Sequence, residues 1–203
     1  MTNTTTIISS KLLEAFIETV STEIGVQNLP AVLKKSGLPA NWADPANAER
    51  LGGQAAAEAY AGLQQAIRAY YGRGARGILQ RIGCSLWTKL LENASLRNKA
   101  QAKIIRGLPE TMRRKSTMDL LSRLLSARLG DVVVHTLDLD LLLIDHISPT
   151  TYHQHDDEPI CYVTQGLIRE SIYWATSREP SIEERRCQAT GAKTCYFKVT
   201  FGA

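Results

Sequence analysis

Apolar residues in the first half of the chain recur with the three- and four-residue spacing of amphipathic helices. Residues 10–24 place one apolar stripe along a helix, which Ser10 caps and Gly25 ends. A second, short helix is predicted over 28–35. Residues 39–53 are rich in Pro, Asn, Asp and Gly, so we interpret them as a linker or loop.

Three more helices are predicted before residue 130. The first is rich in Ala, Leu and Gln, and glycines separate it from the second. Pro109, a residue that suits the first turn of a helix, opens the third, and Gly130 ends it. The predicted ranges are 54–71, 75–91 and 109–130.

After residue 130 the apolar runs become short and rich in β-branched residues, which is typical of strands. We predict strands over 132–137 and 141–144, joined by a turn at 138–140. A polar loop follows, and Pro159 then opens a helix that reaches Thr176.

Two final strands are predicted over 182–188 and 195–201, with Gly191 at a turn position that favours positive φ. The chain therefore runs from a helical layer to hairpin, helix and hairpin. This order predicts an α+β fold in which the helices pack on a four-stranded antiparallel sheet. We divide the chain into an N-terminal helical extension, 1–50, and a second domain, 51–203.

The composition predicts a packed hydrophobic core and a location inside the cell. Hydrophobic residues make up 44% of the 203 residues and charged residues 22%. No apolar run approaches the roughly 18 residues that a membrane span needs. Residues 1–10 are polar and rich in Thr, without the pattern of a signal peptide. We therefore expect a cytoplasmic protein whose thiols stay reduced.

Positive charge is concentrated in the middle of the chain. From Arg68 to Arg128 there are 14 Lys or Arg residues and three acidic ones, whereas 131–158 is acidic. A basic stretch of this kind suits nucleic acid or an anionic membrane surface. Because the basic residues alternate with Ile, Leu and Met at helical spacing, we favour a solvated helix face over a nucleic-acid site.

Three cysteines and a glutamate near the C-terminus are candidate metal ligands. Zinc takes thiolate and carboxylate ligands and usually has four of them in structural sites. Such a shell is closed and leaves no position for a catalytic water. The four residues are Cys161, Glu184, Cys187 and Cys195.

The spacing of these residues leaves alternatives open. The thiols can be buried core residues, or Cys187 and Cys195 can face each other across the last hairpin, with or without a disulfide. Glu184 and Cys187 are three residues apart, so in a regular strand they would point to opposite faces. Both can bind one metal only if the strand bulges or ends between them.

Other polar and aromatic residues are candidates for a ligand site or a second metal site. Trp87, Tyr162, Gln165 and Trp174 lie on or near inward helix faces and suit a mostly apolar pocket, although core packing explains each of them as well. His153 and His155, with the carboxylates that follow, can bind zinc or nickel or form a solvated loop. Cys84 is interpreted as a core thiol, with a fourth thiolate ligand as the alternative.

A series of short motifs follows one order through the C-terminal half. The motifs are Asp-Glu-Pro-Ile-Cys at 157–161, Gly166, Glu184-x-x-Cys187, Gly191 and Cys-Tyr-Phe-Lys-Val at 195–199. This series resembles the 4-vinyl-reductase domain family, which includes accessory proteins of bacteriochlorophyll vinyl reduction and the aromatic-sensing domains of phenol-responsive transcription activators. The resemblance covers about residues 131–199, and the fold of the family is similar to that of TRAPP vesicle-tethering subunits.

The resemblance implies a metal and a ligand. Aromatic-sensing members hold zinc with three cysteines and one glutamate, roles that fall on Cys161, Glu184, Cys187 and Cys195. Their apolar pocket lies between the helices and the sheet, close to the zinc. Phenol-sensing members use a His and a Trp, but residues 132–160 contain no Trp here. An apolar, aromatic or tetrapyrrole-like ligand is therefore expected in place of phenol.

Several functions compete at this point. We favour a small-molecule binding module with a structural zinc, acting as a sensor, a carrier or an assembly aid. The alternatives are a homodimeric interaction module, favoured by the leucines at 120–125, and an accessory role in vinyl reduction. Catalysis has little support, because the chain lacks a Gly-x-Gly-x-x-Gly motif, a Walker loop and a nucleophile elbow.

Overall fold

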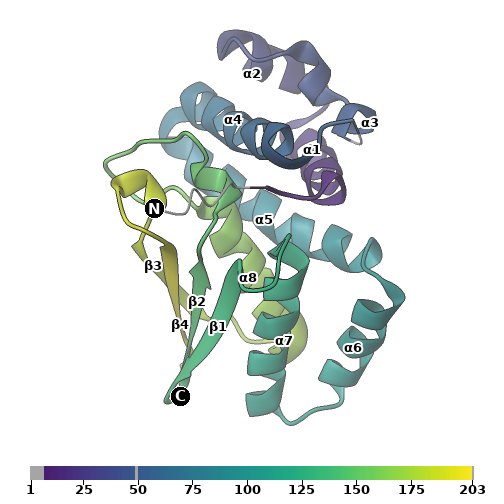
Figure 1. The fold of residues 1–203 in the computed structure, drawn as a ribbon, viewed down its shortest axis with the longest axis vertical. Coiled ribbons are helices and arrows are strands. Elements are labelled where there is room, and N and C mark those ends of the chain that lie inside the picture. The colour runs from purple at the N-terminus through teal and green to yellow at the C-terminus, as the bar shows by residue number, and fades with distance from the viewer. Residues whose placement is uncertain (1–6, 49, 203) are drawn as a thin grey trace.

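Two β-hairpins join into one antiparallel sheet in the computed structural model, which describes residues 7–48 and 50–202. The strands are β1 (Val132–Leu137), β2 (Asp140–Asp145), β3 (Ser181–Arg186) and β4 (Cys195–Thr200). Their order across the sheet is β1-β2-β4-β3 (Figure 1). Buried and partly exposed residues alternate along β2 and β4, so one face of the sheet belongs to the core.

The turns of both hairpins follow the sequence prediction. Leu137 pairs with Asp140, which leaves a two-residue turn, and Asp138 adopts a φ of +53° there. In the second hairpin Gly191 has a φ of +88°, a conformation that glycine adopts without steric cost. The predicted α+β class and four-stranded antiparallel sheet are therefore confirmed.

Eight α-helices lie in the described ranges. Ser9 caps the first of them by accepting a hydrogen bond from the Leu12 N–H at 3.2 Å, one residue before the predicted cap. The helices are α1 (Ser10–Ile24), α2 (Leu29–Lys35), α3 (Pro45–Ala48), α4 (Gly53–Tyr71), α5 (Ala75–Glu92), α6 (Leu96–Arg106), α7 (Glu110–Leu125) and α8 (Tyr162–Thr176).

Helix α7 ends at Leu125 and strand β3 at Arg186, five and two residues before their predicted ends. Three further departures from the predicted elements have local causes. The predicted linker contains a 3₁₀ turn at Ala40–Ala43 and α3, because Pro and Asn also suit single helical turns. Helix α6 was not predicted; only two of its residues are buried, so its apolar periodicity is weak. Helix α8 begins at Tyr162 and not at Pro159, since Cys161 takes the N-cap position.

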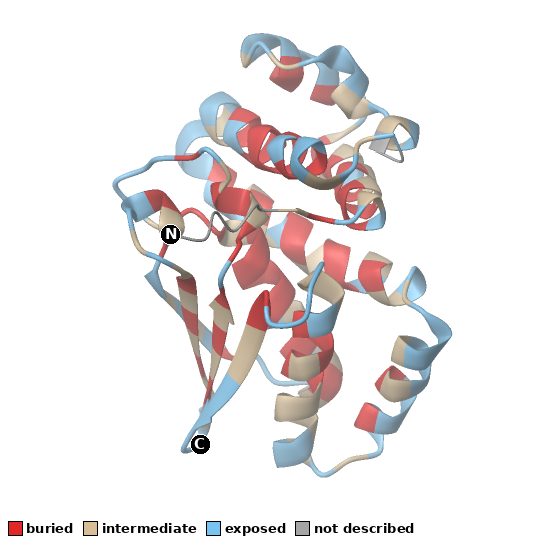
Figure 2. Cartoon of the chain, viewed as in Figure 1, coloured by how far each residue is buried: buried red, intermediate tan, exposed pale blue. Residues whose placement is uncertain are grey.

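Helices α7 and α8 cover the inner face of the sheet, α5 packs on α8, and α1 to α4 close one end (Figure 1). The buried positions gather between these layers in Figure 2 and form one cluster that extends from α1 to β4. Leu120 and Leu121 are buried within the chain, so the leucines that favoured a dimer are partly used in this core. The boundary predicted near residue 50 and the homodimer stay predictions.

The closest approach of two helices in the core is between α5 and α8. A Cβ atom added to Gly83 would lie 2.1 Å from the Val163 carbonyl oxygen, and one added to Gly166 would lie 2.1 Å from the Gln80 carbonyl oxygen. Only glycine on both helices allows the backbones to approach this closely. The contact sets the position of α8, and with it the position of Cys161.

Candidate metal centre and adjoining cavity

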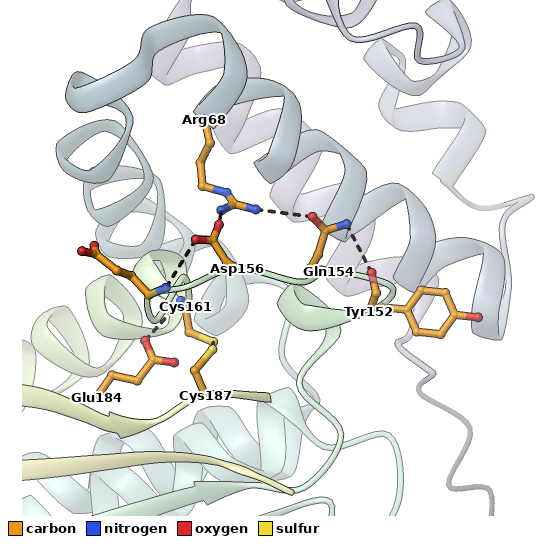
Figure 3. Close-up of polar contacts among 8 residues, drawn as sticks. Arg68, Tyr152, Gln154, Asp156, Cys161, Glu184 and Cys187 are labelled. Carbon is orange, nitrogen blue, oxygen red and sulfur yellow. Dashed lines mark hydrogen bonds and ion pairs between the residues drawn. The ribbon is translucent and has the colours of Figure 1, made fainter. Parts of the chain in front are cut away.

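The four predicted metal ligands converge from three separate elements. Cys161 is the N-cap residue of α8, Glu184 lies in β3, Cys187 follows β3, and Cys195 opens β4. Their donor atoms all lie within 4.8 Å of one another. The structure therefore brings all four together, at the point where the last hairpin meets the start of α8. Figure 3 shows three of them, Cys161, Glu184 and Cys187.

The distances between the sulfurs fit tetrahedral zinc. Cys161 Sγ lies 3.8 Å from Cys187 Sγ and 3.6 Å from Cys195 Sγ. Zinc–sulfur bonds of about 2.3 Å at tetrahedral angles place two sulfurs about 3.8 Å apart. All three thiols are free and fully buried, so a disulfide across the hairpin is not present.

An irregularity in β3 resolves the spacing of Glu184 and Cys187. The pairing of β3 with β4 shifts between Glu184 and Arg186, and the strand ends there. The extra residue turns both side chains to the same side. A short 3₁₀ turn follows, and the Gln188 N–H donates a hydrogen bond to Cys195 Sγ at 3.3 Å.

Glu184 has one oxygen with partners and one without. Its Oε2 accepts hydrogen bonds from the Cys161 N–H and from Gln165 Nε2, each at 3.2 Å. Its Oε1 is buried and has no hydrogen-bond partner among the residues that the structure describes, which is costly for a carboxylate oxygen. A cation bound to Oε1 and to the three sulfurs would give this oxygen its missing partner.

The electrostatics of the cluster favour a cation in the same way. Burial raises the pKa of Glu184 to about 8, and burial raises the pKa of the Cys161 thiol. Hydrogen bonds from Cys161 and Cys195 lower the pKa of Cys187. Four acidic groups packed this closely cannot all ionise by themselves, and a divalent cation removes that obstacle.

The other metal candidates take no part in this cluster. Cys84 on α5 is half-buried and contacts the Gly166 carbonyl oxygen at 3.5 Å, which disfavours it as a fourth thiolate. His153 and His155 are both exposed. Among the described residues, no group of three or more metal-binding side chains includes either histidine.

A small enclosed cavity lies between the helices and the sheet. Its volume is about 10 Å³, enough for about one water molecule. Most of its walls are apolar, and its polar groups come from Tyr60, Asp145 and Thr164. Burial raises the pKa of Tyr60, and the nearby charges of Cys161 and Asp145 add to this shift.

One loop connects the cavity to the metal ligands. Ile147 and Pro149 line the cavity, and Ser148 between them lies with its Oγ 3.8 Å from Cys161 Sγ. Thr151 donates a hydrogen bond to Gln188 Oε1 at 3.0 Å, next to Cys187. A shift of residues 147–151 would therefore move both the cavity wall and the cluster.

Helix α4 holds the continuation of this loop by a polar network. Arg68 forms an ion pair with Asp156 at 2.5 Å and donates a hydrogen bond to Gln154 Oε1 at 3.3 Å (Figure 3). Gln64, one turn earlier, donates to Thr150 Oγ1 at 3.3 Å. The sequence analysis did not single out these contacts, because the partners are 86 or more residues apart.

The four residues predicted to bind ligand fall into two separate pairs. Gln165 lies beside the cluster, and Tyr162 is half-buried with the Arg76 guanidinium 5.6 Å from its ring. Trp174 is 12 residues after Tyr162 on α8, which corresponds to about 18 Å along the helix. The two pairs therefore do not line one small pocket.

Trp87 and Trp174 form the second pair. Trp87 is fully buried and packs edge-to-face on Trp174, with ring centroids 5.6 Å apart. Arg106 covers the outer ring at 5.0 Å. The Trp87 Nε1 has no hydrogen-bond partner within the described residues. Neither tryptophan lines the enclosed cavity, so a role in ligand binding stays a prediction for all four residues.

Sequence signals for the cavity residues were weak. Asp145 ends an apolar strand, a common place for a solvated carboxylate, yet it is buried. Tyr60 occupies an inward helix position that suits any core aromatic. Tyr60 and Asp145 line the same cavity because α4 packs against the loop that follows β2.

Comparisons with known proteins find a likeness of fold but no match of sequence. No protein-family model matches the sequence, and no curated protein matches it. The chain is similar in structure to an H-NOX protein from Shewanella oneidensis in the Fe(II)NO state, with a TM-score of 0.56, 14% identity, and coverage of 97% of this chain and 100% of that one.

Two further solved structures support the same fold. The phenol-responsive sensory domain of the transcription activator PoxR, solved with phenol, has a TM-score of 0.50 and 13% identity over 70% of this chain and 73% of that one. An oxygen-binding H-NOX domain related to soluble guanylate cyclases has a TM-score of 0.51 and 13% identity, covering 95% and 93%. The chain therefore has the fold of these sensory domains. Membership of the 4-vinyl-reductase family stays a prediction.

Proposed function

We propose that this protein is a small-ligand sensor module in which a structural zinc fastens the last hairpin to α8. Cys161, Glu184, Cys187 and Cys195 would hold the ion. When bound, zinc supplies charge neutralisation and a cross-link, and four protein ligands leave no position for a catalytic water. No helix in the described part of the chain is long and apolar enough to cross a membrane.

The contact between the cavity and the cluster through residues 147–149 carries this proposal. Ile147 and Pro149 form the cavity wall, and Ser148 reaches Cys161. A molecule that enters the cavity must displace this wall, and the displacement reaches the metal ligands directly. The similarity to phenol- and NO-binding domains supports a sensory function for such an arrangement.

The walls of the cavity define the class of ligand. Ile8, Leu12 and Val132 favour an apolar body, and Tyr60 and Asp145 can bond one polar group. We therefore propose a small apolar molecule with one hydrogen-bonding group. A volume of about 10 Å³ is far below the several hundred Å³ of usual ligand pockets, so a tetrapyrrole would require α1 or α4 to move away from the sheet.

Native mass spectrometry of the purified protein tests the zinc. We expect a mass excess of one zinc per chain that is retained by Cys84→Ser and lost by Cys187→Ser. Cys84 is the matched control because it is a thiol outside the cluster. Equal zinc content in both variants would reject the proposed ligand set.

Thermal unfolding of the zinc-loaded protein tests the ligand site separately. Leu12→Ala enlarges the cavity, so phenol should raise the Tm of this variant more than toluene does, because toluene lacks a hydroxyl group for Tyr60 and Asp145. Tyr60→Phe in the same background should reduce the difference. If neither compound changes the Tm of any variant, the ligand site is rejected while the zinc site stands.

A further inference from the structure

A second, open concavity lies on the opposite side of β1 from the rest of the sheet. It has a volume of about 780 Å³ and is bordered by the start of α6, the end of α7, the loop 126–130 and β1. We call it the β1 groove. It has no residue of the metal cluster in its walls and is not explained by the proposed sensor site.

One wall of the β1 groove is an unpaired strand edge. β1 is one of the two edge strands of the sheet, and among the described strands it pairs only with β2. Four consecutive residues, 132–135, line the groove. Since successive side chains of a strand point to opposite faces, a wall made of four consecutive residues is the edge of the strand. Such an edge presents backbone N–H and C=O groups that can pair with another strand, apart from the Val132 N–H, which already donates to Ser126 Oγ.

The other walls of the groove are positively charged. Arg97, Arg123 and Arg128 line it, and no Asp or Glu does. Arg123 donates a hydrogen bond to the neutral Gln101, and no ion pair between described residues involves any of the three arginines. Across 93–130 there are nine Lys or Arg residues and two acidic ones, so the surroundings add to this charge.

The loop that forms the rim is held in place by hydrogen bonds. The Arg128 N–H donates to Asp131 Oδ2 at 2.6 Å, and the Val132 N–H donates to Ser126 Oγ at 3.3 Å. Leu129 is fully exposed on this loop and lines the groove. The rim thus presents an apolar side chain next to uncompensated arginines, a combination typical of a protein-binding surface.

We propose that the β1 groove binds an extended acidic segment of a partner protein, which adds to the sheet beside β1. The strand edge would bond the backbone of the segment, and the arginines would pair with its carboxylates. Strand pairing favours a polypeptide over nucleic acid or a membrane, neither of which uses a row of backbone donors and acceptors. Val132 lines both the groove and the enclosed cavity, so the two sites share a wall.

Fluorescence anisotropy with the full-length, zinc-loaded protein tests this proposal. The probe is a labelled peptide of ~8 residues that alternates Glu and Val, long enough to pair along one strand. We expect saturable binding that Arg123→Glu with Arg128→Glu weakens roughly tenfold or more. The matched control is Lys34→Glu with Arg73→Glu, an equal charge change on exposed residues of other elements, which should leave binding nearly unchanged.

A second peptide and two other probes distinguish pairing from charge attraction. The same peptide with alternate backbone nitrogens methylated keeps its charge but loses donors, and should bind roughly tenfold more weakly. Equal binding of both peptides, or no binding of either, would overturn the proposal. The proposal would also be overturned if Arg123→Glu with Arg128→Glu weakened the binding of duplex DNA or phosphatidylserine vesicles but left the binding of the peptide unchanged.

Discussion

At the scale of single residues, the buried carboxylates carry most of the chemistry of this molecule. Glu184 offers Oε1 to the cluster while its other oxygen receives two N–H groups. Asp145 accepts a hydrogen bond from the Ile147 N–H at 3.1 Å inside the cavity wall. Both side chains have a raised pKa because they are removed from water, but only Asp145 lies outside the proposed metal site.

Asp145 should make the stability of the protein depend on pH. Burial raises its pKa to about 7 in the folded state, whereas an unfolded aspartate ionises near pH 4. The folded state therefore holds this proton more tightly, so the contribution of Asp145 to stability is greatest below about pH 4 and is lost as the pH rises to about 7. Asp145→Asn cannot lose this proton. The difference in unfolding free energy between the variant and the wild type should therefore shift in favour of the variant by roughly 1 kcal/mol for each pH unit between about pH 4 and pH 7.

Urea unfolding of both proteins at a series of pH values measures this difference. The comparison cancels the pH dependence of the metal ligands, which both proteins share. Parallel curves for the two proteins would show that Asp145 does not titrate in this range.

At the scale of elements, the crossing of α5 and α8 determines where the cluster forms. Gly83 and Gly166 let the two backbones meet, and α8 carries Cys161 at its first turn. The register shift in β3 is the second determinant, because it turns Glu184 towards Cys187. Neither feature contributes a metal ligand, yet both are required for the four donor atoms to meet.

Gly83→Ala should destabilise the protein strongly. The new methyl group would lie 2.1 Å from a backbone oxygen of α8, so the helices would have to separate, at a cost of roughly 3 kcal/mol or more. Gly77→Ala on the same helix has only an arginine side-chain atom at 3.8 Å and should stabilise by about 0.5–1 kcal/mol. Thermal and urea unfolding of both variants measure the contrast; similar stabilities would disprove the close crossing.

At the scale of the whole molecule, the proposed zinc joins the last hairpin to the helix that packs beside it. It would tie the end of β3 and the start of β4 to α8, while α1 and α4 contribute Leu12 and Tyr60 to the wall of the enclosed cavity. The basic groove and the enclosed cavity lie on two sides of β1. The sheet is thus the element through which the three features are connected.

Removal of zinc by a chelator should lower stability and should do so unevenly. In small zinc peptides, metal binding contributes on the order of 10 kcal/mol to folding, and we expect a loss of several kcal/mol here. Hydrogen exchange should accelerate in β3, β4 and the first turn of α8, and change least in α1 and α2. Uniform acceleration in all elements would instead indicate global unfolding without a local role for the metal.

Local patterns in the sequence were sufficient to predict most of the elements and to select the four candidate metal ligands. Helix and strand periods, the turn at Gly191 and the strands of both hairpins were predictable, because they depend on neighbours in the chain. The candidates Cys161, Glu184, Cys187 and Cys195 follow from residue type together with the resemblance to the 4-vinyl-reductase domain family. Helix α6 was missed because few of its residues face the core.

How these parts meet depends on the tertiary structure. The approach of the three sulfurs, the unpartnered oxygen of Glu184, the cavity beside Tyr60 and Asp145, and the charged groove along β1 all involve elements distant in sequence. Local periodicity specifies which face of an element is buried, whereas the partner of that face is set by packing over the whole chain.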